Sequence, residues 1–163
     1  MLGRDSEHSD KAGFQVHNSL VYWVNRLAGA MRESFNLALK EVDVSWPQWL
    51  ALNTLYHGQV ETPAQIADFV GVDRSAVTRL LDRLADKGLV VREHDHGDRR
   101  SVKVRLTQSG RLKMRRIDEL AKAHQASFLS HLPPTEVRAF KGNLQKLLRA
   151  GGLESNTLWR NLD

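Results

Sequence analysis

The stretch from Thr62 to Thr107 constrains the fold of this chain more than any other part of its sequence. It contains two short helical patterns joined by Gly71-Val72, and glycine permits the positive φ at which a helix ends. A strand pattern, a charged loop with two adjacent arginines and a second, alternating strand pattern follow. This order predicts a small helical lobe that carries a β-hairpin.

Capping residues and apolar spacing place the expected elements. Thr62, Pro63 and Gln65 form a capping box for a helix that ends at Val70, and Asp73 caps a helix from Arg74 to about Lys87. Strands are expected over 89–93 and 102–106. Longer amphipathic helices are expected over 14–42 and 108–131, with shorter ones over 48–56 and about 137–148. On the 108–131 helix, the expected buried side consists of Leu112, Ile117, Leu120, Ala121 and Phe128.

The composition excludes several classes of protein. The 163 residues include no cysteine, which removes disulfides, thiolate metal sites and cysteine nucleophiles. The polar N-terminus lacks the apolar centre of a secretion signal, and no apolar run is long enough to cross a bilayer. We therefore expect a cytoplasmic protein that does not contact membranes.

Basic charge is concentrated in and just after the lobe. The net charge is +5, but thirteen Lys and Arg against five Asp and Glu between Arg74 and Arg116 give this segment +8, leaving −3 elsewhere. Such a basic centre is typical of a phosphate-binding surface, although a solvated arginine-rich face is the alternative. Together with the order of elements, it predicts a winged helix-turn-helix, with one helix in the DNA major groove and a basic loop in the minor groove.

Two segments resemble the MarR family of bacterial transcription regulators, particularly its SlyA-like members. VDRSAVTRLLDRLADKGLVVRE is similar to the family's recognition helix and the strand behind it. DRRSVKVRLTQSG is similar to its wing signature, through Asp98, Arg100, Leu106, Thr107 and Gly110. The resemblance covers nearly the whole chain, from Phe14 to about Leu148.

The resemblance implies a homodimer of mainly α chains with a small β-hairpin wing, an α+β winged helix-turn-helix flanked by a helical dimerisation layer. Residues 1–45 and 107–163 are expected to form the dimerisation region, and residues 46–106 the DNA-binding domain. The apolar stripes of the first and last helices, which a winged lobe alone cannot cover, agree with this division. The expected partners are double-stranded DNA, a second copy of the chain and, in many relatives, a small-molecule effector.

The exposed N-terminal part of the second short helix carries the candidate base-reading residues, and Val77 is expected in the core. Arginine can bind guanine through two hydrogen bonds, Ser and Thr can bind bases or phosphates, and Ala can contact thymine methyl groups. Arg83, one turn further on, contacts phosphate or pairs with Asp82 or Asp86. The candidates are Arg74, Ser75, Ala76, Thr78, Arg79 and Arg83, together with Thr62 and Gln65, which either bind phosphate at a helix N-terminus or act only as a cap.

The charged loop supplies the expected wing. Arg100 is the candidate for insertion into the minor groove, where narrow A·T tracts attract a guanidinium, and Asp98 would orient Arg100 or Arg79. Arg99, Ser101 and Lys103 are candidate phosphate contacts. His94 and His96 lie two apart and could chelate a metal, but a DNA-facing role explains them as well, so we expect no metal site.

The effector and any catalytic role are less constrained. Trp23, Arg26, Trp46, Trp49 and His57 lie on helices that in relatives border the ligand cavity and would suit an aromatic carboxylate; the alternative is that the tryptophans are core and interface residues. The chain has no Gly-x-Ser-x-Gly elbow and no phosphate-binding Gly-rich loop, so we expect no enzyme and no cofactor. The rival hypothesis is a small-molecule or metal sensor that acts through protein partners.

Overall fold

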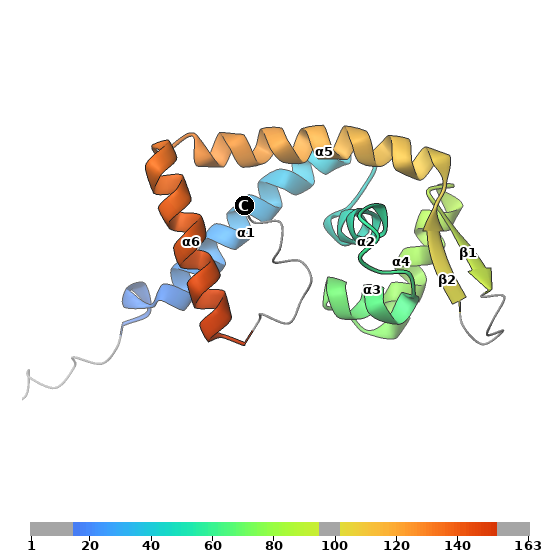
Figure 1. Ribbon diagram of the computed structural model, residues 1–163, viewed down its shortest axis with the longest axis horizontal. Coiled ribbons are helices and arrows are strands. Elements are labelled where there is room, and N and C mark those ends of the chain that lie inside the picture. The colour runs from blue at the N-terminus through green and yellow to red at the C-terminus, as the bar shows by residue number, and fades with distance from the viewer. Residues whose placement is uncertain (1–14, 95–101, 153–163) are drawn as a thin grey trace, which may run out of the picture.

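The computed structural model describes residues 15–94 and 102–152, which form a mainly helical structure with one two-stranded sheet (Figure 1). α5 runs along the top of Figure 1, from the lobe of α2, α3, α4 and the hairpin at one end to α6 at the other. The elements are η1 (Val16–Asn18), α1 (Leu20–Lys40), α2 (Trp46–Tyr56), α3 (Pro63–Val70), α4 (Arg74–Asp86), β1 (Val90–His94), β2 (Val102–Leu106), α5 (Gln108–Leu129) and α6 (Pro134–Ala150).

Local capping sets most helix starts. The backbone N–H of Ser45 donates to Gln48 Oε1 at 3.0 Å, and the hydroxyl of Thr107 accepts from the N–H of Gly110 at 2.9 Å. Such bonds satisfy N–H groups that the first helical turn leaves without a partner. The predicted elements of the lobe are confirmed, with each boundary within two residues of its expected place.

The first long helix begins later than predicted. Val16–Asn18 form a short 3-10 helix, and Ser19 is extended and accepts a hydrogen bond from the N–H of Tyr22 at 3.3 Å. Apolar spacing continues through this segment, but a serine that caps the following turn interrupts the helix. The predicted start at Phe14 is therefore wrong.

The buried face of α5 also differs from the prediction. Leu112 is 56% exposed, whereas Met114 and Ile117 are fully buried and Gly110 is buried with them. Residues 110, 114 and 117 follow the four-and-three spacing of one helix face, and Leu112 lies on another. Leu112 was expected to be buried because it is apolar. The helix instead packs against the lobe through the face that contains Gly110.

The core lies in the lobe and beneath α5. Its largest fully buried side chains are Leu39, Leu52, Ile66, Leu81, Leu84, Met114 and Ile117. They come from α1, α2, α3, α4 and α5, so α4 is held by apolar contacts along the whole of its inner side. Burying a leucine or isoleucine stabilises the fold by about 1.5–3 kcal/mol.

The first turn of α5 closes against the end of α4. Thr107 donates its backbone N–H to Leu89 O at 3.1 Å and its hydroxyl to Gly88 O at 2.6 Å. A Cβ on Gly110 would stand 2.1 Å from Leu89 O, so no side chain fits at this position. This close approach explains why a glycine stands four residues after Leu106, the last residue of β2.

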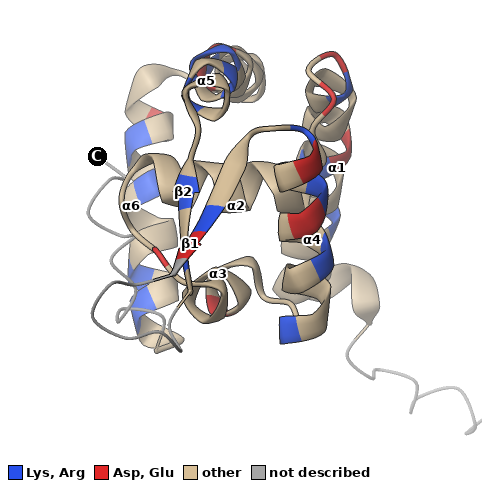
Figure 2. Cartoon of the chain, turned by 90° about the vertical axis from the view of Figure 1, so that its right-hand side faces the viewer, with Lys and Arg blue, Asp and Glu red and all other residues tan. Residues whose placement is uncertain are grey.

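Apolar side chains remain exposed on α1 and α6. Leu20, Val21, Trp23, Val24 and Leu27 are exposed on α1, and α6 buries none of its residues although Phe140 and Leu147 are apolar. The two helices overlap in Figure 1, but Figure 2 shows them on opposite sides of the molecule. Among the residues that the structure describes, no helix is long and apolar enough to span a membrane.

Candidate nucleic-acid interface

α4 divides sharply into a buried and an exposed side. Val77, Leu81 and Leu84 are fully buried, while Arg74 and Arg79 are exposed near the N-terminal end. The other predicted reading residues on this helix are also exposed (Ser75, Thr78 and Arg83), and Ala76 is partly buried. An exposed helix face with several guanidinium groups fits the width of a DNA major groove.

The N-terminus of α4 is capped by Asp73. The carboxylate accepts from the hydroxyl of Ser75 at 2.6 Å and from the N–H of Ala76 at 2.7 Å. These two bonds, with a smaller contribution from the charge of Arg79, lower the pKa of Asp73. The Ser75 hydroxyl therefore already has an acceptor within the chain and can offer its lone pairs to another donor.

The turn before α4 depends on one glycine. Gly71 has φ +74°, in the left-handed region, and its N–H donates to Ala67 O at 2.9 Å. This conformation ends α3 and redirects the chain so that α4 follows after two residues. The predicted helix–turn–helix geometry is thus present.

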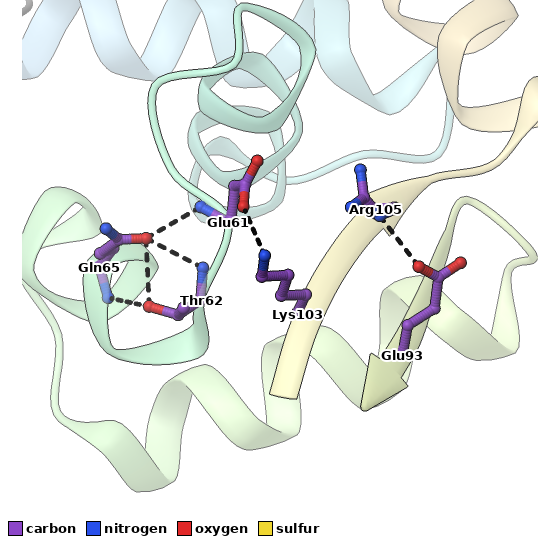
Figure 3. Close-up of polar contacts among 6 residues, drawn as sticks. All are labelled: Glu61, Thr62, Gln65, Glu93, Lys103 and Arg105. Carbon is purple, nitrogen blue, oxygen red and sulfur yellow. Dashed lines mark hydrogen bonds and ion pairs between the residues drawn. The ribbon is translucent and has the colours of Figure 1, made fainter. Parts of the chain in front are cut away.

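Thr62 and Gln65 form the predicted capping box at the start of α3 (Figure 3). Gln65 Oε1 accepts from the backbone N–H groups of Glu61 at 2.9 Å and Thr62 at 3.1 Å. The Thr62 hydroxyl accepts from Gln65 N at 3.3 Å. The capping role is confirmed, and a phosphate contact by these residues stays a prediction.

The hairpin is antiparallel, with Val90 opposite Leu106 and His94 opposite Val102. Val104 donates its N–H to Glu61 O at 2.7 Å, which attaches β2 to the segment before α3. Lys103 lies 3.5 Å from Glu61 Oε2 in an ion pair, as Figure 3 shows. Lys103, a predicted phosphate contact, is therefore placed on a strand fixed to the lobe.

The remaining wing candidates lie beyond the described part of the hairpin. Asp98, Arg99, Arg100 and Ser101 fall within residues 95–101, outside the described residues, and so does His96. Their predicted roles stay predictions. Within the described ranges 15–94 and 102–152, no group of three or more His, Asp or Glu is arranged to hold a metal ion.

Arg92 was not predicted to belong to the site. Its Nη2 donates to Thr78 O at 3.1 Å and lies 2.7 Å from Asp82 Oδ1, so it links β1 to α4. Asp82 is thus paired with the hairpin and not with Arg83. The strand pattern could have indicated this role. Arg92 lies two residues after buried Val90 and so on the same side of the strand, where a charged side chain requires a partner.

The five predicted effector residues do not gather in one cavity. The ring centroids of Trp46 and Trp49 are 4.8 Å apart with the rings tilted by 52°, and Trp49 also contacts Phe35 edge-to-face at a centroid distance of 4.9 Å. Trp23 lies elsewhere on α1 and donates its indole N–H to His17 O at 2.7 Å, while His57 is exposed beyond α2. Arg26 lines a separate hollow of about 400 Å³. The alternative, that the tryptophans pack within the fold, describes Trp46 and Trp49 best.

A larger groove lies between α1 and α4, and we call it the α1–α4 groove. It has a volume of about 820 Å³ and includes Lys40, Asp43, Arg83 and Lys87 in its lining. Lys87, at the end of α4, forms an ion pair of 2.9 Å with Asp43, which has a φ of +53° in the α1–α2 turn. The groove therefore adjoins both the candidate reading helix and the helix with the exposed apolar face. Figure 2 shows basic and acidic residues interleaved along α4.

Comparisons with known proteins agree with this geometry. The family model described as the MarR family matches residues 44–102. An uncharacterized HTH-type transcriptional regulator of Bacillus subtilis, YfiV, is 32% identical over 152 residues, which cover 84% of this chain and 94% of that protein. An HTH-type transcriptional repressor of Mycobacterium tuberculosis is 28% identical over 128 residues, which cover 78% of this chain and 92% of that protein.

Solved structures agree as well. The apo form of wild-type MarR from E. coli superposes with a TM-score of 0.72 at 27% identity, covering 80% of this chain and 97% of that one. A MarR mutant from E. coli complexed with operator DNA gives a TM-score of 0.71 at 26% identity, covering 79% of this chain and 93% of that one.

Proposed function

This chain belongs to the MarR family of transcription regulators, and we propose that it is a repressor that binds a pseudo-palindromic operator as a homodimer. The main support for this proposal is the outer side of α4, where arginines and hydroxyl groups are exposed while the inner side is fully buried. The E. coli relative solved with operator DNA supports DNA as the partner, and a repressor among the relatives supports the sign of regulation. A DNA partner favours the predicted cytoplasmic location.

In the proposed complex, α4 lies in the major groove and the hairpin follows the adjacent backbone into the minor groove. Arg74 and Arg79 would read base edges with Ser75, Ala76 and Thr78, and Arg83 would contact phosphate because it lies further along the helix. Lys103 would contact phosphate from β2, and the predicted tip residues, Arg100 above all, would enter the minor groove.

The proposed dimer is formed by residues 1–45 and 107–163, with residues 46–106 as the DNA-binding domain. The exposed apolar side chains of α1 and the absence of any buried residue on α6 support this division. A second copy of the chain would cover these faces. Twofold symmetry then sets two α4 helices about one DNA turn apart, which is the reason for expecting a palindrome.

We propose that a small-molecule effector binds in the α1–α4 groove. Basic and acidic side chains line the groove in equal number, and Leu37 and Val44 offer apolar contact, so the groove suits a ligand with both polar and apolar groups. A ligand held there would touch both α1 and α4, so its binding would change the placement of α4 relative to the dimer.

The proposal is tested by selecting duplexes from a random-sequence library with the purified protein. We expect an inverted repeat whose half-sites are about 10 base pairs apart, and an affinity that falls steeply with salt. Light scattering of the same preparation should give the mass of a dimer. The sensor that acts through protein partners instead predicts that no duplex is enriched and that affinity for DNA is weak at every salt concentration.

A further inference from the structure

Arg92 is a charged residue on the inner side of the hairpin. The register places it opposite Val104, which is buried, and two residues beyond Val90, which is also buried. Alternate residues of a strand point to the same side, so Arg92 shares its side with apolar residues that pack on the lobe. The charged residues Glu93 and Arg105 pair with each other at 2.9 Å on the other side.

Both partners of Arg92 belong to α4. Thr78 O is 3.1 Å from Arg92 Nη2, and Asp82 Oδ1 is 2.7 Å from the same nitrogen. Thr78 and Asp82 lie one helical turn apart, so a single guanidinium spans a turn of the helix. The side chains of Arg92 and Asp82 are 35% and 51% exposed, which leaves the pair partly shielded from water.

The contact lies two residues beyond the base of the hairpin, at the level where β2 is also attached to the lobe. Val90 and Leu106 pair at the base and are buried in the core, while Val104, opposite Arg92, is buried and donates its N–H to Glu61 O. Arg92 therefore holds β1 to α4 at the same level at which Val104 holds β2 to the segment before α3. A link at this point restricts the angle between the hairpin and α4 more than a link at the base does.

The negative charge of Asp82 is unfavourable on a helix that binds DNA. It lies on α4 between Arg79 and Arg83, on a helix proposed to approach DNA phosphates, where a carboxylate is repelled. The ion pair with Arg92 compensates for this repulsion and gives a structural reason for a carboxylate at this position.

We propose that Arg92 is a positioning residue that fixes the hairpin to α4 through Thr78 and Asp82, so that both elements meet one DNA duplex in a set geometry. This inference rests on the proposed DNA-binding function and adds Arg92 and Asp82 to the residues that determine it. Removal of the negative charge of Asp82 is therefore expected to weaken DNA binding, whereas the repulsion between carboxylate and phosphate alone predicts that this change strengthens binding.

The experiment measures the affinity of full-length variants for a duplex that the wild-type protein selects from a random library. Arg92→Gln and Asp82→Asn are each expected to weaken binding about tenfold, the lower part of the range for a lost contact at such an interface. The double variant should be no weaker than the single ones, because both remove the same link. Arg92→Lys, which keeps the charge beside Asp82, should stay within about threefold of wild type.

Matched controls come from the ion pair on the other side of the hairpin. Glu93→Gln removes a carboxylate that does not touch α4, and it should leave affinity unchanged or raise it. Thermal unfolding of every variant accompanies the titrations. If Arg92→Gln does not fold, the comparison of Asp82→Asn with Glu93→Gln and the effect of Arg92→Lys still decide the matter.

An Asp82→Asn variant that binds as tightly as wild type or more tightly overturns the proposal. If, in addition, Arg92→Gln lowers the slope of log affinity against log salt by about one, Arg92 is a phosphate contact and not a positioning residue. A wild-type protein that selects no duplex contradicts the proposed function itself, which is a separate outcome.

Discussion

At the scale of single residues, the packing around position 110 requires a glycine, although the helix propensity of glycine is low. An alanine in a helix is normally more stable than a glycine by about 1 kcal/mol, yet a Cβ here would stand 2.1 Å from the carbonyl oxygen of Leu89. Because that atom belongs to the backbone, Gly110→Ala should destabilise the fold by about 1–3 kcal/mol. Urea unfolding measures the change.

Gly142 on α6 is the matched control, since no atom of the described residues lies within 4 Å of a Cβ built there. Gly142→Ala should leave stability unchanged or raise it by up to about 1 kcal/mol. If Gly110→Ala also left stability unchanged, this result would contradict the close approach of the first turn of α5 to Leu89 O.

Asp73 makes the cap of α4 sensitive to acid. Bonds from Ser75 and Ala76 hold the pKa of this carboxyl below its ordinary value. The folded state therefore binds the proton less readily than the unfolded state, and the contribution of Asp73 is fully present above the ordinary pKa of an aspartate, about 3.9. It is lost as the pH falls through the lower folded value.

Asp73→Asn should therefore unfold less steeply with acid below about pH 4 than wild type does, while keeping stability near neutral pH because asparagine also caps helices. Asp73→Ala should be less stable at every pH. Thermal unfolding between acid and neutral pH measures both, and identical acid dependence of wild type and Asp73→Asn would refute the assignment.

At the scale of elements, the lobe could be predicted because its signals are local. Thr62, Asp73 and Thr107 begin helices, and Gly71 ends one, each by bonds or torsions within a few residues. Leu112 and Arg92 show the limit of such signals. Which face of α5 is buried, and which partner Arg92 meets, depend on packing between segments distant in the sequence.

The capping box of α3 carries a prediction at this scale. Thr62→Ala removes the acceptor for Gln65 N and should lower the free energy of unfolding by about 1 kcal/mol. Chemical denaturation measures this change, and an unchanged midpoint would show that the box adds nothing. Titration with DNA separates the two roles proposed for Thr62: affinity falls only if this N-terminus also binds phosphate.

At the scale of the whole molecule, the exposed side of α6 predicts assembly. Leu147 is 59% exposed in the single chain, and Leu147→Glu would place a charge in the proposed dimer interface. We expect monomeric or insoluble protein, and operator affinity should fall with dimerisation. Lys146→Glu, on a different face of the same helix, is the control and should remain a dimer.

Light scattering at micromolar concentration distinguishes these states. A wild-type protein that is already monomeric there would contradict the proposed division into dimerisation and DNA-binding regions.

The outer side of α4 is proposed to read the DNA sequence, and Arg79 is exposed at the middle of that side. Wild type and Arg79→Ala are titrated in parallel against the selected duplex and a scrambled duplex of equal length and composition. We predict a loss of about 1–3 kcal/mol on the selected duplex and little change on the scrambled one, because a base contact contributes only where its base is present. Equal losses on both duplexes, or no loss on either, would contradict base reading by α4.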